Sequence, residues 1–202
     1  KSEDKETIVF LKDCGFSENI ISKFFSPFFA GIFLENKLST SSKFFKYVFS
    51  KFGKGLASLP SNGMQEIPEN MLSRVDRENL FLNCELEHIT KEKKVKLKDG
   101  KTILPSKIVF TGNSQKLINK KLVNYNSVKT LYFNSSVNPD YSRYIHIFPQ
   151  EKYINNIAFL TSISQRYSRN NDSLISVSII KEDNISDSKL ITHIKDRLIN
   201  IY

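Results

Sequence analysis

The residues of this chain that could carry chemistry are few and widely spaced. Cys14 and Cys84 stand alone, without a C-x-x-C pair, and their isolation indicates reduced thiols in a cytoplasmic protein. The three histidines, His88, His146 and His193, lack the spacing of zinc ligands, so we expect no metal site. No Ser-His-Asp or Cys-His grouping follows from the spacing either.

The glycines do not form a phosphate-binding loop. Gly53 and Gly55 are the only close pair, and they lack both a third glycine and a preceding strand. We therefore expect no self-sufficient dinucleotide site in this chain.

A lysine on an apolar strand is the strongest candidate for a catalytic charge. In the strand that we expect near Val128–Asn134, alternation places Lys129 on one face with Leu131 and Phe133. The alternative is a lysine at a strand end, whose stem packs on the sheet while its ammonium reaches solvent.

Phenylalanine is concentrated in one stretch, since nine of the 16 lie between Phe24 and Phe52. That much aromatic area cannot all face water, which predicts a helical core, the wall of an apolar cavity, or both. The rings that we expect to line a substrate cavity are Phe28, Phe29, Phe33, Phe45 and Phe49. For any single ring, plain helix packing is the alternative.

Helices must position these rings and strands must position the lysine. Ser17 is a candidate N-cap, and Pro27 predicts that the helix it starts ends at Ser26. The expected helices are Thr7–Cys14, Ser17–Ser26, Lys43–Phe52, Gln65–Arg74, Leu117–Leu122 and one after Ser186 or Asp187. The expected strands are Leu80–Thr90, Lys94–Lys98, Thr102–Phe110, Val128–Asn134, Tyr144–Phe148, Ile154–Leu160 and Ser173–Ile180, with turns at Asp99-Gly100 and Asn138–Asp140.

This order of helices, a β-meander, more strands and a helix predicts an α+β fold with a mixed β-sheet. We expect a helical part at 1–60, a β-meander at 61–125, and a sheet with a closing helix at 126–202.

Composition narrows the classes of function. The formal net charge is +9, but the lysines are scattered and do not outline a nucleic-acid groove. No apolar run is long enough to span a bilayer, and no secretory leader is visible. The chain begins with Lys1, so we expect a piece of a longer protein.

Several segments, in order, resemble the middle of flavin-containing amine oxidases and phytoene-desaturase-like FAD-dependent oxidoreductases. They are Phe24–Phe33, Leu38–Ser42, Leu59–Met64, Leu82–Ile89, Val95–Gly100, Ile108–Gly112 and Ser127–Phe133. The family's Gly-Gly before methionine is Asn62-Gly63 here, a mild departure. The resemblance covers nearly the whole chain, without the family's amino-terminal Gly-rich βαβ unit.

The resemblance implies an enzyme in which a hydride leaves an apolar substrate or an amine for FAD. It implies that the parts at 1–60 and 126–202 belong to the substrate domain and that 61–125 belongs to the FAD domain. We expect the full-length parent to hold FAD, and this piece alone to be inactive and without it.

The same resemblance assigns roles to single residues. It places the main chain of Leu86 at the adenine, Thr111 and Gly112 beside the cofactor, and Gly63 in a loop close to the cavity. It places Lys129 where related amine oxidases hold a water near the flavin. Each role has a structural alternative. Leu86 could be an ordinary strand residue, Thr111 and Gly112 a turn after a strand, Gly63 a turn glycine, and Lys129 a lysine in solvent.

As partners we expect an apolar small-molecule substrate and no nucleic acid, with peripheral membrane contact and a homodimer left open. The alternative function is a stand-alone module that binds an apolar ligand or another protein without redox activity. A basic nucleic-acid-binding module ranks behind both.

Overall fold

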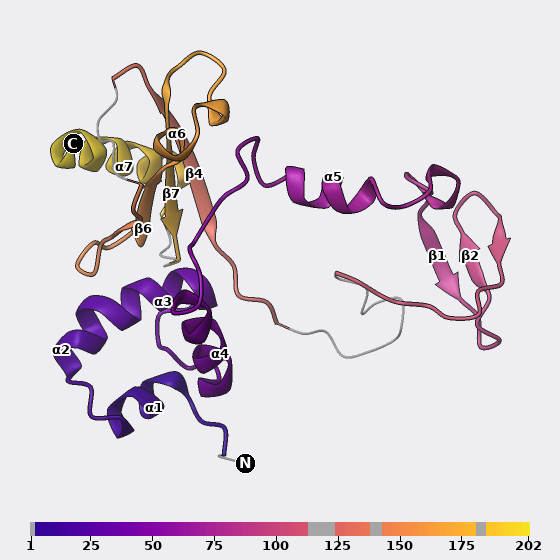
Figure 1. Ribbon diagram of the computed structural model, residues 1–202, viewed down its shortest axis with the longest axis horizontal. Coiled ribbons are helices and arrows are strands. Elements are labelled where there is room, and N and C mark those ends of the chain that lie inside the picture. The colour runs from indigo at the N-terminus through magenta and orange to yellow at the C-terminus, as the bar shows by residue number, and fades with distance from the viewer. Residues whose placement is uncertain (1–2, 113–123, 138–142, 181–184) are drawn as a thin grey trace. The chain divides into compact units, whose positions relative to one another are not determined.

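The computed structural model describes residues 3–112, 124–137, 143–180 and 185–202 (Figure 1). Contacts divide the chain into two compact units, one formed by residues 1–67 and 126–202 and one by residues 68–125. Helices accompany sheets in the described residues, so the predicted α+β class is confirmed. The predicted mixed sheet is wrong, since every strand pair in the described residues is antiparallel. The predicted three-part division stays a prediction.

Helices form the amino-terminal part of the first unit. They are α1 (Thr7–Asp13), α2 (Glu18–Ile20), the π-helical turn η1 (Ile21–Phe25), α3 (Ser26–Phe33) and α4 (Ser42–Phe52). Ser17 caps α2, because its hydroxyl accepts a hydrogen bond from the Ile20 N–H at 3.4 Å. Ser41 caps α4 by accepting from Lys43 and Phe44.

The prediction that a helix ends at Ser26 is wrong. The Ser26 N–H donates to the Ile21 carbonyl across the wide turn η1, and α3 then starts at Ser26 itself. Pro27 therefore falls in the first turn of a new helix, where its missing N–H costs nothing. The helical path continues through the proline because the π turn changes the hydrogen-bond spacing just before it.

A four-stranded sheet forms the other part of this unit. Its strands are β4 (Lys129–Ser135), β5 (His146–Ile147), β6 (Asn156–Phe159) and β7 (Ser173–Ile179), in the order β4-β7-β6-β5 with every pair antiparallel. Ile175, Val177 and Ile179 point to one buried face. Helix α7 (Asp187–Ile201) covers that face with Leu190, Ile194 and Leu198 (Figure 1). The short helices α6 (Leu160–Ile163) and η4 (Gln165–Tyr167) connect β6 to β7.

The second unit contains a β-meander. Its strands, in the order β1-β2-β3, are β1 (Leu86–Ile89), β2 (Val95–Leu97) and β3 (Thr102–Ile103). Gly100 has a φ of +87°, as the predicted Asp99-Gly100 turn requires. Helices α5 (Glu66–Leu72) and η2 (Arg77–Asn79) precede the meander.

The prediction of a strand reaching Phe110 is wrong. Strand β3 ends at Ile103, and Val109 is 85% exposed instead of buried. Pro105 has no N–H to continue the ladder, and within the described residues no strand pairs with 104–112. The predicted helix Leu117–Leu122 and turn Asn138–Asp140 lie outside the described residues.

Candidate functional site

Three of the five rings predicted to line a cavity are core residues. Phe29, Phe33 and Phe45 are 0%, 5% and 4% exposed, and the Phe29 and Phe45 ring centroids lie 4.6 Å apart. They share one apolar cluster with Leu11, Ile21, Phe25 and Leu38. These three rings therefore follow the alternative given above, in which a ring packs between helices and does not line a cavity.

The other two rings lie at the exposed margin of the same cluster. Phe28 stacks on Phe24 at 5.6 Å with an interplanar angle of 9° and meets Phe52 edge-on at 5.4 Å. Phe24, Phe49 and Phe52 are 39%, 48% and 46% exposed. We call Phe24, Phe28, Phe49 and Phe52 the aromatic edge, since these rings offer apolar area to something outside the core.

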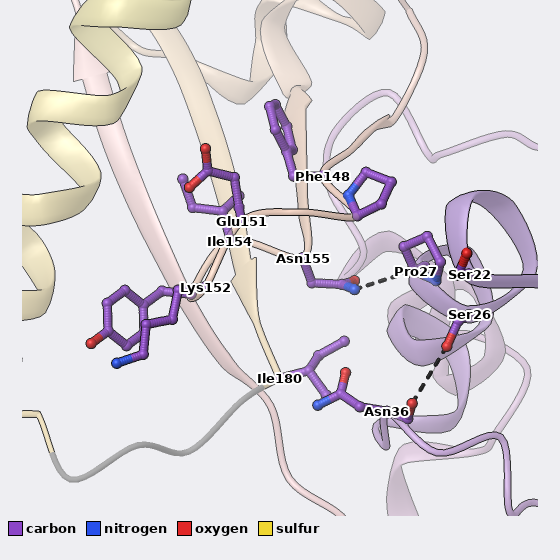
Figure 2. Close-up of a pocket in the computed structure, with 12 residues that line it drawn as sticks. Ser22, Ser26, Pro27, Asn36, Phe148, Glu151, Lys152, Ile154, Asn155 and Ile180 are labelled. Carbon is purple, nitrogen blue, oxygen red and sulfur yellow. Dashed lines mark hydrogen bonds between the residues drawn. The ribbon is translucent and has the colours of Figure 1, made fainter. Parts of the chain in front are cut away.

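A set of close polar contacts joins the helices to the sheet. The side-chain amide of Asn155, just before β6, donates to the Pro27 carbonyl at 3.0 Å (Figure 2). A Cβ on Gly31 would lie 3.1 Å from Asn155 Oδ1 and 3.1 Å from Asn156 Nδ2. The absence of a side chain at Gly31 therefore lets the two asparagine side chains lie against the backbone of α3.

A small polar pocket lies beside the Asn155–Pro27 contact, between the helices and the sheet of the first unit (Figure 2). It encloses about 110 Å³ between Ser22, Ser26 and Pro27 on the helices and the segment 148–155. The Ser26 hydroxyl donates to the Asn36 carbonyl at 3.4 Å, and the Glu151 carboxylate pairs with Arg197 of α7. A pocket of this size has room for a few waters and none for a bulky apolar substrate.

Three hydrogen bonds hold the loop that contains Gly63. The Ser164 hydroxyl donates to the Ser61 carbonyl at 3.0 Å, Arg166 to the Asn62 side chain at 2.9 Å, and the Tyr167 hydroxyl to the Pro60 carbonyl at 2.8 Å. Gly63 has a φ of +101°, and a Cβ added to it would meet no atom within 4 Å, which is the geometry of a turn glycine. The sequence did not predict these three hydrogen bonds, because their donors lie about a hundred residues away from the loop.

Lys129 begins β4 and shares a face with Leu131 and Phe133, as predicted from alternation. That face is the one that α7 covers, and the Lys129 ammonium lies 2.6 Å from the Asp187 carboxylate in the first turn of α7. The Lys129 side chain is 50% exposed. This position fits the strand-end lysine, and its role near a flavin stays a prediction.

In the second unit, Leu86 opens the edge strand β1. It stands opposite Leu97 in β2, and the Lys98 N–H donates to the Glu85 carbonyl at 2.9 Å. A bond between these flanking residues makes Leu86 and Leu97 a non-hydrogen-bonded pair of the antiparallel ladder. The N–H and C=O of Leu86 are therefore directed away from β2, toward the open edge of the sheet.

The other cofactor candidates of this unit are exposed. Thr111 and Gly112 are the last residues of the unpaired segment 104–112, and Gly112 has a φ of +67°. A hollow of about 600 Å³ lies elsewhere in the unit, between the segment 80–85 and the end of β2. At the hairpin tip the Lys101 N–H donates to the Asp99 carboxylate and holds the pKa of Asp99 below its ordinary value.

No group of three or more metal-ligating side chains occurs among the residues that the structure describes. Within the same residues no helix is long and apolar enough to cross a membrane. Both cysteines are free and exposed.

The described residues form an α+β chain with a Phe-rich helical part, a four-stranded sheet and a β-meander. The family model for flavin-containing amine oxidoreductases matches residues 1–132. The chain therefore belongs to the flavin-containing amine oxidoreductase family, whose members are flavin-dependent oxidoreductases. A comparison with curated proteins found no match.

Proposed function

We propose that this chain supplies the substrate wall and the adenine contact of an FAD-dependent oxidoreductase that removes a hydride from an apolar substrate. A bound flavin would supply the redox chemistry as the two-electron acceptor of a hydride from the substrate, and the accompanying proton would leave to solvent. Family membership supports the class of reaction. The choice of an apolar substrate, in preference to an amine, rests on the rings of the aromatic edge.

The observation that carries the proposal is the outward-facing main chain of Leu86. A donor and an acceptor on one residue can pair with the complementary edge of an adenine ring, as a neighbouring strand would. The strand order leaves this edge of β1 without another strand among the described residues. The chain has no Gly-rich phosphate loop, so these residues fit the adenine end of FAD and not its pyrophosphate.

The aromatic edge supports the substrate side of the proposal. Phe28 and Phe49 were predicted to line the cavity, and they present apolar rings at the margin of a rigid core. Rings fixed in this way orient a bulky apolar molecule and keep water from the reacting carbon. We propose a place near the cofactor for Lys129, Thr111, Gly112 and Gly63 as well, with the family resemblance as its only support.

The test is expression from the whole gene, followed by the visible absorbance of the purified protein. We expect bound flavin, and we expect the colour to bleach when an apolar substrate is added without oxygen. Leu86→Ala should keep the flavin, whereas Leu86→Pro, which removes the outward N–H, should weaken flavin binding about tenfold. A colourless protein, or equal flavin loss in both variants, would refute the proposal.

A further inference from the structure

Helix α4 carries lysines and exposed aromatic residues on the side opposite Phe45. Lys43, Tyr47 and Lys51 are four residues apart and therefore line one side of the helix, with Phe44 beside them. The surface continues past the helix end to Lys54 and to Leu56, which is 96% exposed. We call these six residues the basic aromatic face.

The aromatic rings of this face are separate from the aromatic edge. Phe44 and Tyr47 are 45% and 59% exposed, while Phe45, on the opposite side of α4, is 4% exposed in the core. Two large rings and a leucine in water are therefore not a consequence of poor packing around α4. They are apolar groups that stay largely in solvent, with Phe44 touching the core at its margin, where its ring centroid lies 5.7 Å from that of Phe33.

The charge of the surrounding sequence has one sign. Residues 36–65 contain five lysines and no aspartate or glutamate. Among the described residues, none of these lysines forms a salt bridge, and the Lys51 ammonium lies over the Tyr47 ring at 4.9 Å. Three carboxylates contact the ends of this segment. Asp4 accepts hydrogen bonds from Ser41 and the Lys43 N–H, Glu35 accepts from the Lys37 N–H and Thr40, and Glu66 accepts from the Asn62 N–H.

We propose that the basic aromatic face docks this protein onto an anionic lipid surface. Lysines that form no salt bridge attract the headgroup phosphates, and the exposed rings and Leu56 enter the boundary between headgroups and acyl chains. Lysines interleaved with aromatic residues on an amphipathic helix favour this occupant over a second copy of the chain, whose matching face would be equally positive. The inference stands whether or not the redox proposal holds.

Flotation of the 202-residue chain with vesicles tests the proposal. Vesicles containing about a third phosphatidylglycerol should carry the protein, and pure phosphatidylcholine vesicles should carry far less. The variant Lys43→Gln/Lys51→Gln/Lys54→Gln should lose roughly 100-fold in partitioning, since each lysine near the surface contributes about fivefold. The control Lys91→Gln/Lys94→Gln/Lys96→Gln removes the same charge from the second unit and should lose less than about threefold.

A second pair of variants tests insertion apart from charge. Phe44→Ser/Tyr47→Ser should bind anionic vesicles at low salt and release them at high salt, where the wild-type protein is still retained by its rings. The control Leu104→Ser/Val109→Ser removes apolar groups that are 75% and 85% exposed in the second unit, and it should bind like the wild type.

Four outcomes would overturn the proposal. The first is no difference between anionic and neutral vesicles, and the second is equal loss in the two lysine variants, which would mean that net charge alone binds. The third is tighter binding to duplex DNA than to anionic vesicles at the same salt. The fourth is a dimer in light scattering that Phe44→Ser/Tyr47→Ser converts to a monomer, because a second copy would then cover the face.

Discussion

The two units differ sharply in how much apolar surface they bury. The first unit has two apolar clusters, one among the helices around Phe29 and one between α7 and the sheet around Val177 and Ile194. In the described part of the second unit the buried apolar side chains are Val95 and Leu97. Its Phe81, Leu82 and Val109 are 72%, 71% and 85% exposed.

The amount of buried apolar surface determines which unit is stable without a ligand or further protein. Each fully buried large apolar side chain contributes roughly 1.5–3 kcal/mol, so the first unit has many such contributions and the second has two. A three-stranded meander with so few is marginal in water. The second unit is thus the part of the chain that gains most from a ligand or from further protein against it, as a cofactor-binding part would.

Phe29→Ala should have the largest effect in this set of variants. It removes a fully buried ring from the helical cluster and should lower the free energy of unfolding of the first unit by about 3–5 kcal/mol. Hydrogen exchange should show the loss on α3, α4 and β7, while β1 and β2 amides keep their rates.

The matched control is Phe49→Ala, which removes a ring that is 48% exposed and should cost about half as much. If β1 and β2 exchange faster together with α3 in Phe29→Ala, the two units share one unfolding transition and the contrast between them fails.

Gly31→Val should have the next largest effect, because it disturbs the contact between the helices and the sheet of the first unit. The added side chain meets Asn155 and Asn156, and the Asn155 bond to Pro27 must shift. We expect a loss of about 1–3 kcal/mol, measured by urea unfolding.

Gly55→Val is the control, since nothing lies within 4 Å of a Cβ at Gly55. Equal stability of the two variants would show that the helices and the sheet are not packed as tightly as the contacts indicate.

Local signals in the sequence predicted the local parts of this structure. Ser17 and the Asp99-Gly100 turn act where their side chains and backbone preferences place them, and the alternation of β7 gives its buried face. Errors arose where a non-local partner decides the outcome. Ile108–Phe110 has the composition of a buried strand, but no strand of the described residues pairs with it.

The candidate site shows the same limit. The sequence placed Phe29, Phe45 and Phe49 together in one expected cavity wall, but it could not say which ring the core would bury and which would stay at the margin. The hydrogen bonds from Ser164 and Tyr167 to the loop 60–62 had no sequence signal, since each joins residues more than a hundred positions apart.

Ser41→Ala should have a smaller effect, confined to the first unit. It removes the cap of α4, worth about 1 kcal/mol, and the hydroxyl that donates to Asp4. That hydroxyl is the main cause that holds the pKa of Asp4 below its ordinary value.

The lowered pKa of Asp4 makes the stability of the fold depend on pH. A carboxyl whose pKa is lower in the folded state stabilises the fold at neutral pH and loses that contribution as the pH falls through its folded pKa. The difference in unfolding free energy between wild type and Asp4→Asn should therefore shrink under acid conditions. A difference that is constant from neutral to acid pH would contradict the assignment.

Lys129 permits the finest comparison of the two units, because each unit has an exposed ion pair of the same length. Lys129 lies 2.6 Å from Asp187 in the first unit, and Lys98 lies 2.6 Å from Glu85 in the second. Exposed pairs contribute about 0–1 kcal/mol, so Lys129→Gln and Lys98→Gln should each change stability by less than about 1 kcal/mol.

Turnover in the flavin-loaded protein separates a catalytic lysine from a structural one. If Lys129 acts near the flavin, Lys129→Gln should lower kcat while Asp187→Asn and Lys98→Gln leave it unchanged. If the lysine only anchors the start of α7, Asp187→Asn should reproduce whatever Lys129→Gln does, because both variants remove the same ion pair.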